Sequence, residues 1–162
     1  MADKMKIVIL AAGKGTRMKD EKLKVLVEFK GKPLTKHLLQ AVEESGIDKK
    51  PVIVVGYQKE KVMDALGQNY LYAIQEEQLG TGHAVMSAEE TLGGAENIMV
   101  LQSDHPLITG KTIRKLAEKH FESKSKITMA VADFVDFKNW RSTFYTSFSR
   151  IIRDKANKII RD

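Results

Sequence analysis

A strand-like apolar run that leads directly into a glycine-rich loop constrains this chain more than any other feature of its sequence. Residues 5–11 are apolar apart from one lysine, as in a parallel strand that is covered on both faces. Gly13 and Gly15 follow at once, accompanied by Lys14 and Arg17. Glycines let backbone N–H groups approach a phosphate closely, and an arginine can hold phosphate oxygens in a bidentate fork. The segment therefore predicts a buried strand, a phosphate-binding loop and a helix.

Strand and helix patterns alternate along the rest of the chain. Short apolar runs predict further strands at residues 51–56, 70–75, 97–102 and 127–134. Amphipathic spacing predicts helices between them, at residues 33–45, 59–66, 83–92 and 109–121. A short hairpin is expected at residues 150–162, with its turn near residues 155–157. This alternation predicts an α/β fold of the three-layer α/β/α, Rossmann-like type, with a mostly parallel sheet, in a single domain of residues 1–162.

Composition and charge limit the classes of protein that remain. The chain has no cysteine, which excludes disulfides and thiolate metal sites, and no apolar run approaches the roughly 18–20 residues of a membrane span. The first residues lead into a strand without a signal-peptide pattern, so we expect a cytoplasmic protein with no membrane partner. A net charge of +6 favours an anionic ligand, although a solvated basic surface explains it equally well. The sequence shows no platform of aromatic and basic residues, so no nucleic-acid partner is expected.

The residues best suited to bind a ligand follow the predicted strands. The glycine-rich loop follows the first strand, Gln75 to Gly82 follow the third, and Asp104 follows the fourth. Ligands of such folds bind beyond the carboxyl ends of the strands, so these residues are expected to share one site. Two simpler interpretations stay open: a glycine-rich turn after a strand is often only a turn, and a carboxylate close to a proline also turns a chain. The loop matches neither the dinucleotide-binding fingerprint, since a third glycine is absent, nor the spacing of a P-loop.

Ordered motifs between residues 7 and 107 resemble those of one enzyme superfamily. Residues 9–18 (ILAAGKGTRM) resemble the signature loop of the sugar-phosphate nucleotidyltransferases. Residues 23–26 (LKVL) and 31–34 (GKPL) follow at the distances typical of that superfamily. Residues 75–84 (QEEQLGTGHA) and 103–107 (SDHPL) resemble, more narrowly, the pyrophosphorylase domain of bacterial N-acetylglucosamine-1-phosphate uridylyltransferases.

The resemblance implies a reaction and a set of site residues. A sugar 1-phosphate, expected to be N-acetylglucosamine 1-phosphate, attacks the α-phosphate of a nucleoside triphosphate, expected to be UTP, and pyrophosphate leaves. Such catalysis consists mainly of positioning and neutralisation of charge, with Mg²⁺ as the implied cofactor. The implied roles are catalysis by Arg17 and Lys24, metal binding by Asp104, sugar binding by Ser149, and nucleotide binding by Leu10, Ala11, Ala12, Gly13, Lys14, Gly15, Gln75, Gly80 and Thr81. His83 is expected to support the start of a helix rather than to act as a base.

Three residues depart from the motifs of the superfamily. Leu23 stands where a proline usually precedes the lysine, which removes a ring that fixes φ near about −65°. Ser103 replaces the glycine before Asp104, so that its Cβ could crowd a ribose or demand a different backbone angle. Ser149 replaces a glycine that contacts the sugar, which puts that contact in doubt.

The end of the sequence leaves the extent of the activity open. The last residues resemble the return hairpin of the pyrophosphorylase domain, so we expect the chain to lack the C-terminal part of that domain, including the second metal ligand. One alternative is a module that only binds nucleotide, as a regulatory domain or an inactive remnant. Another is transfer to a different acceptor, such as an alditol phosphate, phosphocholine or molybdopterin; the Gly-Thr-Gly-His segment argues against it. The oligomeric state is not predicted.

Overall fold

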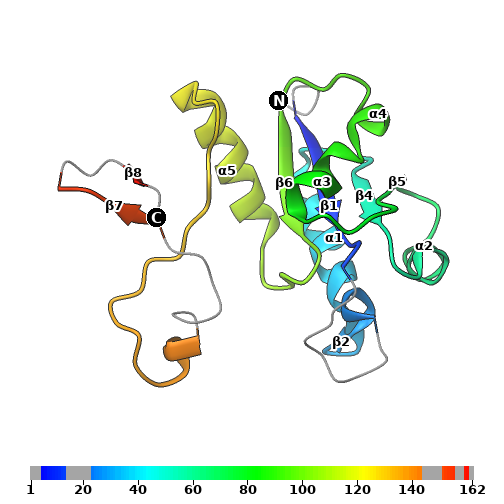
Figure 1. The fold of residues 1–162 in the computed structure, drawn as a ribbon, viewed down its shortest axis with the longest axis horizontal. Helices are drawn as coiled ribbons and strands as arrows, with labels where there is room; N and C mark the ends of the chain where they lie inside the picture. The colour runs from blue at the N-terminus through cyan, green and yellow to red at the C-terminus, as the bar shows by residue number, and fades with distance from the viewer. Residues whose placement is uncertain (1–4, 14–22, 144–150, 156–158, 161–162) are drawn as a thin grey trace. The chain divides into compact units, whose positions relative to one another are not determined.

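The structure, a computed structural model, describes residues 5–13, 23–143, 151–155 and 159–160. The chain divides into two compact units, residues 1–128 and 129–162. The first unit contains a four-stranded parallel sheet in the order β5–β4–β1–β6 (Figure 1). Its strands are β1 (Lys6–Leu10), β4 (Val52–Val55), β5 (Leu71–Ile74) and β6 (Ile98–Gln102). The four predicted strands up to residue 102 are thus confirmed.

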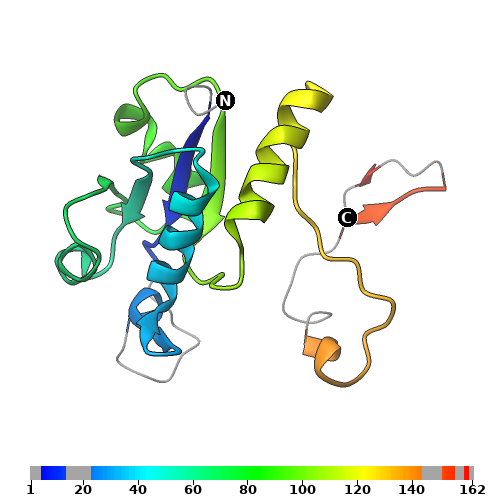
Figure 2. The same ribbon diagram turned by 180° about the vertical axis from the view of Figure 1, so that it is seen from behind.

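The central strands β1 and β4 are apolar apart from Lys6 because helices cover both of their faces. On β1, Ile7 and Ile9 belong to one buried cluster, whereas Val8 and Leu10 belong to another, as the alternation of side chains along a strand requires. The first cluster includes side chains of the helices α1 (Leu34–Ser45), α2 (Lys59–Leu66) and α5 (Gly110–Ser123). The second includes Ala84 of α3 (Thr81–Met86) and Ala88, which precedes α4 (Glu89–Leu92). Figures 1 and 2 show α3 in front of the sheet and α1 behind it, so the three-layer α/β/α prediction is confirmed.

Helices α1 and α5 lie side by side on the first face (Figure 2). Gly110 begins α5 where it meets the end of α1, and a Cβ built there would lie 2.9 Å from the carbonyl oxygen of Ala41 and from the backbone nitrogen of Ser45. One turn further along, the Arg114 guanidinium donates hydrogen bonds to the carbonyl oxygens of Glu44 (2.8 Å) and Ser45 (3.2 Å). These bonds satisfy carbonyls that the last turn of a helix leaves without partners. The absence of a side chain at Gly110 therefore sets how closely the two helices approach.

The helix expected at residues 83–92 is interrupted. Two short helices, α3 and α4, take its place, and residues 87 and 88 form a turn between them. The Ser87 hydroxyl donates to the carbonyl oxygen of His83 (2.9 Å), a bond to the preceding turn that bends helices. The apolar spacing continues across this break, which explains why the pattern alone predicted one helix.

The prediction of a strand at residues 127–134 is wrong. The structure assigns no strand there, and the described strands of the sheet end at β6. The apolar side chains of Ile127, Met129 and Val131 are 78%, 56% and 63% exposed. Alternating apolar residues form a stable strand only when neighbouring strands accept their hydrogen bonds, and no described strand pairs with this segment.

The sequence pattern also missed several short elements. In the first unit these are the 3₁₀ helix η2 (Lys24–Leu26) and the hairpin of β2 (Glu28–Phe29) and β3 (Lys32–Pro33). In the second unit, the 3₁₀ helix η3 (Asn139–Arg141) was also missed.

The antiparallel strands β7 (Ile152–Arg153) and β8 (Ile159–Ile160) confirm the expected hairpin, although residues 156–158 of its turn lie outside the described residues. Over the described part of the chain, no helix has the length and apolar character needed to cross a membrane.

Candidate nucleotide site

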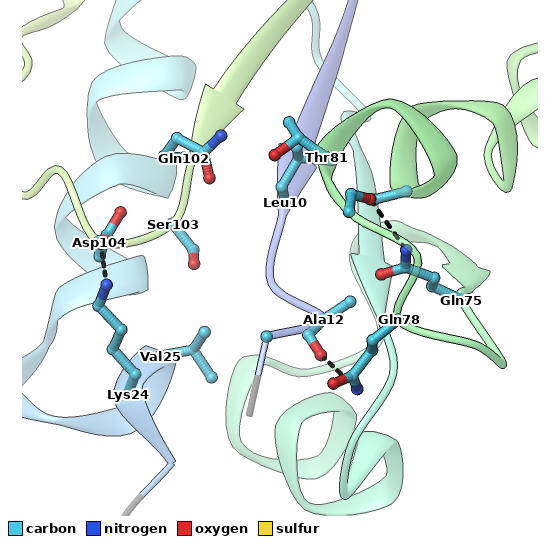
Figure 3. A pocket seen from close by; sticks show the side chains of 13 residues that line it. Leu10, Ala12, Lys24, Val25, Gln75, Gln78, Thr81, Gln102, Ser103 and Asp104 are labelled. Carbon is cyan, nitrogen blue, oxygen red and sulfur yellow. Dashed lines mark hydrogen bonds and ion pairs between the residues drawn. The ribbon is translucent and has the colours of Figure 1, made fainter. Parts of the chain in front are cut away.

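A pocket of about 260 Å³ lies beyond the carboxyl ends of β1, β5 and β6 (Figure 3). Three segments distant in sequence supply most of its walls, together with η2. The described residues that line it are Leu10, Ala12, Gly13, Lys24, Val25, Gln75, Gln78, Gly80, Thr81, Ala84, Gln102, Ser103 and Asp104. The structure thus brings together, at the expected edge of the sheet, most of the residues that the sequence motifs single out.

The remaining candidates fall into two groups. Ala11 is buried in the core rather than in the pocket wall, and its backbone nitrogen donates to the carbonyl oxygen of Val54 (2.8 Å). Its contribution is therefore to hold the end of β1 against β4. Lys14, Gly15, Arg17 and Ser149 lie outside the described residues.

Lys24 and Asp104 form an ion pair inside the pocket (Figure 3). Their side chains are 44% and 27% exposed, so both remain accessible to a ligand. Burial alone would raise the pKa of Asp104, but the hydrogen bond and the positive charge of Lys24, helped by His105, hold this pKa below its ordinary value. A carboxyl group with a lowered pKa stabilises the fold above its ordinary pKa, and that contribution is lost as the pH falls through the lowered value. Asp104 is therefore a carboxylate at neutral pH, as a metal ligand must be.

Leu23 prepares the position of Lys24 despite the departure from proline. Its backbone has φ −57° and ψ 125°, which lies within the range that a proline ring imposes. Its side chain is buried, as is that of Val25 on the other side of the lysine. Burial of both neighbours thus holds the short helix η2 where the proline of the related motif would constrain the backbone directly.

Ser103 accommodates its side chain without unusual backbone geometry. It is buried, its backbone nitrogen donates to the carbonyl oxygen of Leu10 (3.2 Å), and it is not among the described residues with positive φ. The expected need for a different backbone angle is therefore not observed. Ser103 does line the pocket.

Gln75 is the most buried polar side chain of the pocket wall, with 4% exposure. Its amide nitrogen contacts the carbonyl oxygen of Gly80 (3.2 Å) and Nδ1 of His83 (3.1 Å). Gly80 has φ +100°, a backbone conformation that glycine adopts far more readily than other residues. The glycine therefore aims its carbonyl group at Gln75 and begins α3 at the same point.

Sequence reasoning missed Gln78, which lines the pocket, and Gly56, which lies against two lining residues without lining the pocket itself. The Gln78 amide donates to the carbonyl oxygen of Ala12 (3.0 Å) and so joins the loop before α3 to the start of the glycine-rich loop (Figure 3). At Gly56, an added Cβ would lie 3.0 Å from the carbonyl oxygen of Gln75 and 3.1 Å from that of Ala12. Gln78 lies inside the motif of residues 75–84, so a signal for it existed, whereas Gly56 follows a strand without any motif of its own.

The donor set of the pocket suits a magnesium ion more than a metal that needs several protein ligands. Among the described residues, no group of three or more His, Cys, Asp or Glu side chains could hold a metal ion. Mg²⁺ prefers oxygen, keeps several waters, and commonly binds proteins through one or two carboxylates together with the phosphates of a substrate. Asp104, a carboxylate at the edge of a pocket with a lysine beside it, fits that pattern.

Sequence comparison finds a matching family model and similar relatives. Residues 7–158 match the family model described as "MobA-like NTP transferase domain". The chain is 42% identical over 154 residues to the bifunctional protein GlmU of Caldanaerobacter subterraneus subsp. tengcongensis, a match that covers 95% of this chain and 32% of that protein. It is 45% identical over 130 residues to GlmU of Staphylococcus epidermidis, covering 80% of this chain and 29% of that protein. The chain therefore spans about a third of the length of these relatives.

Solved structures share the fold. A nucleotidyl transferase from Methanothermobacter superposes with a TM-score of 0.64 at 22% identity, covering 72% of this chain and 57% of that one. A UDP-glucose pyrophosphorylase complexed with UDP-glucose gives a TM-score of 0.61 at 22% identity, covering 74% and 54% of the two chains. HddC from Yersinia pseudotuberculosis, complexed with GMP-PN, gives a TM-score of 0.61 at 26% identity, covering 72% and 54%.

Proposed function

We propose that this chain, which belongs to the family of MobA-like NTP transferase domains, binds UTP and transfers its uridylyl group to N-acetylglucosamine 1-phosphate. The observation that carries the proposal is one pocket, at the carboxyl ends of parallel strands, that is lined by a lysine, a carboxylate and a buried amide. The alignment with a GlmU protein, which is 42% identical and covers 95% of this chain, supports the choice of nucleotide and sugar.

The chemistry needs little more from the protein than position and charge. The phosphate oxygen of the sugar attacks the α-phosphorus of UTP, the bond to the β-phosphate breaks, and pyrophosphate leaves with the electron pair of that bond. Negative charge on the phosphates is neutralised by Lys24, a flexible ammonium whose side chain is 44% exposed and can turn from Asp104 toward a substrate. A bound Mg²⁺ supplies further neutralisation of the phosphate oxygens, and Asp104 is the residue that would hold it. Gln75 lies across the pocket from Lys24 and Asp104 (Figure 3), and we expect Gln75 and Gly80, which both line the pocket, to contact the base.

A direct assay tests the proposal. The intact gene product is mixed with UTP, Mg²⁺ and N-acetylglucosamine 1-phosphate, and release of pyrophosphate is followed. We expect turnover that requires all three components. UTP binding without turnover on any common sugar 1-phosphate would favour a nucleotide-binding module instead, and the absence of any nucleotide binding would contradict both functions.

The variant Asp104→Asn is expected to weaken Mg²⁺-dependent binding of UTP by about tenfold or more, because an amide oxygen lacks the negative charge that holds a divalent cation. Calorimetry with and without EDTA measures the effect. Without metal, the variant and the unmodified protein should differ far less. Glu77→Gln is the matched control, since it removes an equal charge from an exposed side chain near the pocket that does not line it. Unchanged UTP affinity of Asp104→Asn in the presence of Mg²⁺ would refute the metal assignment.

A further inference from the structure

The orientation of the Gln75 amide is fixed by two neighbours with different chemistry. The carbonyl oxygen of Gly80 can only accept a hydrogen bond, so the group that faces it at 3.2 Å must be the amide nitrogen of Gln75. The second hydrogen of that nitrogen is directed to Nδ1 of His83 at 3.1 Å. Nδ1 must accept this bond, which places the imidazole proton of a neutral His83 on Nε2.

These two bonds leave the amide oxygen of Gln75 for the ligand. Both of the side-chain hydrogen bonds of Gln75 to described residues come from its nitrogen. The nitrogen bonds to Gly80, and Figure 3 shows the oxygen of the Gln75 amide turned away from that dashed bond, toward the pocket that Gln75 lines. The wall therefore presents an acceptor to the base and no donor from this amide.

An acceptor at this point distinguishes pyrimidines by their N3 atom. N3 of uracil carries a hydrogen and donates, whereas N3 of cytosine carries a lone pair and accepts. A site with a fixed acceptor rejects a ligand that offers another acceptor, because both groups then lose a hydrogen-bonding partner away from water. Thymine has the same N3–H as uracil, so it is expected to donate to the Gln75 oxygen as uracil does.

We propose that His83 is a positioning residue for base selection, and that it favours uracil by holding Gln75 with its amide oxygen toward the pocket. The inference rests on the proposed function, in which the pocket takes a nucleoside triphosphate. His83 itself does not line the pocket; it belongs to α3 and contacts the amide nitrogen of Gln75, which does line it. The bond to Gly80 selects the amide nitrogen for that side, but a single contact of 3.2 Å restrains the broad terminal torsion of a glutamine only in part. The second contact, with His83, removes the remaining freedom.

Removal of the acceptor at position 83 should therefore change selectivity more than affinity. In His83→Leu and in His83→Ala, the Gln75 amide can rotate and offer its N–H group to the base. We expect the preference for UTP over CTP to fall about tenfold in both variants, whereas the ratio of UTP to dTTP affinity stays unchanged. His83→Asn should retain the preference, because the Asn side-chain oxygen takes the place of Nδ1 as acceptor. A merely structural role would weaken the three nucleotides by the same factor.

The test measures dissociation constants of UTP, CTP and dTTP by calorimetry in the presence of Mg²⁺, on this chain and on the three variants. Met86→Leu, at an exposed side chain of the same helix, is the control and should bind like the unmodified protein. If the unmodified chain shows no preference for UTP over CTP, both the proposed nucleotide and the inference about His83 are wrong. If the unmodified chain prefers UTP and either His83→Leu or His83→Ala keeps the full preference while folded, the proposed function stands and the inference alone is overturned.

Discussion

Lys24→Ala is expected to lower the rate of nucleotidyl transfer by about 100-fold or more while leaving the fold intact. The loss of one preorganised charge or donor at the position where charge develops typically costs about 100- to 1,000-fold in rate. The folded state should be little affected, because the Lys24 side chain is 44% exposed and an ion pair of this kind contributes little to stability. The effect should therefore fall on the catalytic step rather than on the amount of folded enzyme.

Steady-state kinetics on the intact gene product, with circular dichroism to confirm folding, measures this effect. Lys59→Ala is the matched control, since it removes the same charge from a lysine that pairs with Glu76 (3.2 Å) and does not line the pocket. We expect that control to retain its rate. Transfer at the unmodified rate in Lys24→Ala would remove Lys24 from the mechanism. A rise in KM at constant kcat would restrict its role to binding that the ground state and the transition state share equally.

The core strands were predictable from the sequence because burial on both faces leaves a continuous apolar run. Residues 5–11 and 51–56 each showed such a run, and the structure forms β1 and β4 within them. The helix at residues 59–66 was predicted with the bounds that the structure shows. These elements are specified by side chains that are neighbours in sequence, so a local pattern contains the necessary information.

The failure at residues 127–134 has the opposite cause. The alternation of apolar side chains there indicates a segment that could form a strand. It does not indicate whether a partner strand is available to pair with it. A strand is stabilised by hydrogen bonds to segments elsewhere in the chain, and a local pattern carries no information about them. The described sheet pairs β6 with β1 and with no other strand, and residues 127–134 pair with none.

The candidate site shows the same division. Lys24, Gln75 and Asp104 are predictable because short motifs carry them, and the rule that ligands bind at strand ends predicts from the sequence alone that they lie together. The contact of Gln78 with the carbonyl oxygen of Ala12 joins positions 66 residues apart, and it depends on how the two loops approach each other. Leu23 shows the reverse case, since a residue that seemed to loosen the loop adopts the proline-like angle through burial of its side chain.

The close approach of α1 and α5 leads to the largest expected effect on stability. Gly110→Ala should destabilise the fold by about 2 kcal/mol, because extra atoms in a packed contact typically cost about 1–3 kcal/mol. The added Cβ would lie 2.9 Å from a carbonyl oxygen and a backbone nitrogen of α1, and backbone atoms cannot move aside by changing a rotamer. Alanine is the better helix former by up to about 1 kcal/mol, but this gain is smaller at the first residue of a helix.

Urea unfolding measures the difference between Gly110→Ala and the unmodified chain. Gly82→Ala is the control, because it also adds a Cβ near the start of a helix but meets no atom within 4 Å, so its stability should be unchanged or slightly higher. Equal stability of Gly110→Ala and the unmodified chain would show that the two helices can separate without cost. That result would also weaken the account of the pocket, because Ile113 and Ala117 of α5 belong to the same buried cluster as Met99 and Leu101 of β6, and β6 leads directly to Ser103 and Asp104. A loss of stability in Gly110→Ala, but not in Gly82→Ala, would show that the close packing of α1 against α5 stabilises the helical layer on the face of the sheet to which β6 belongs. Asp104, the candidate metal ligand, follows β6.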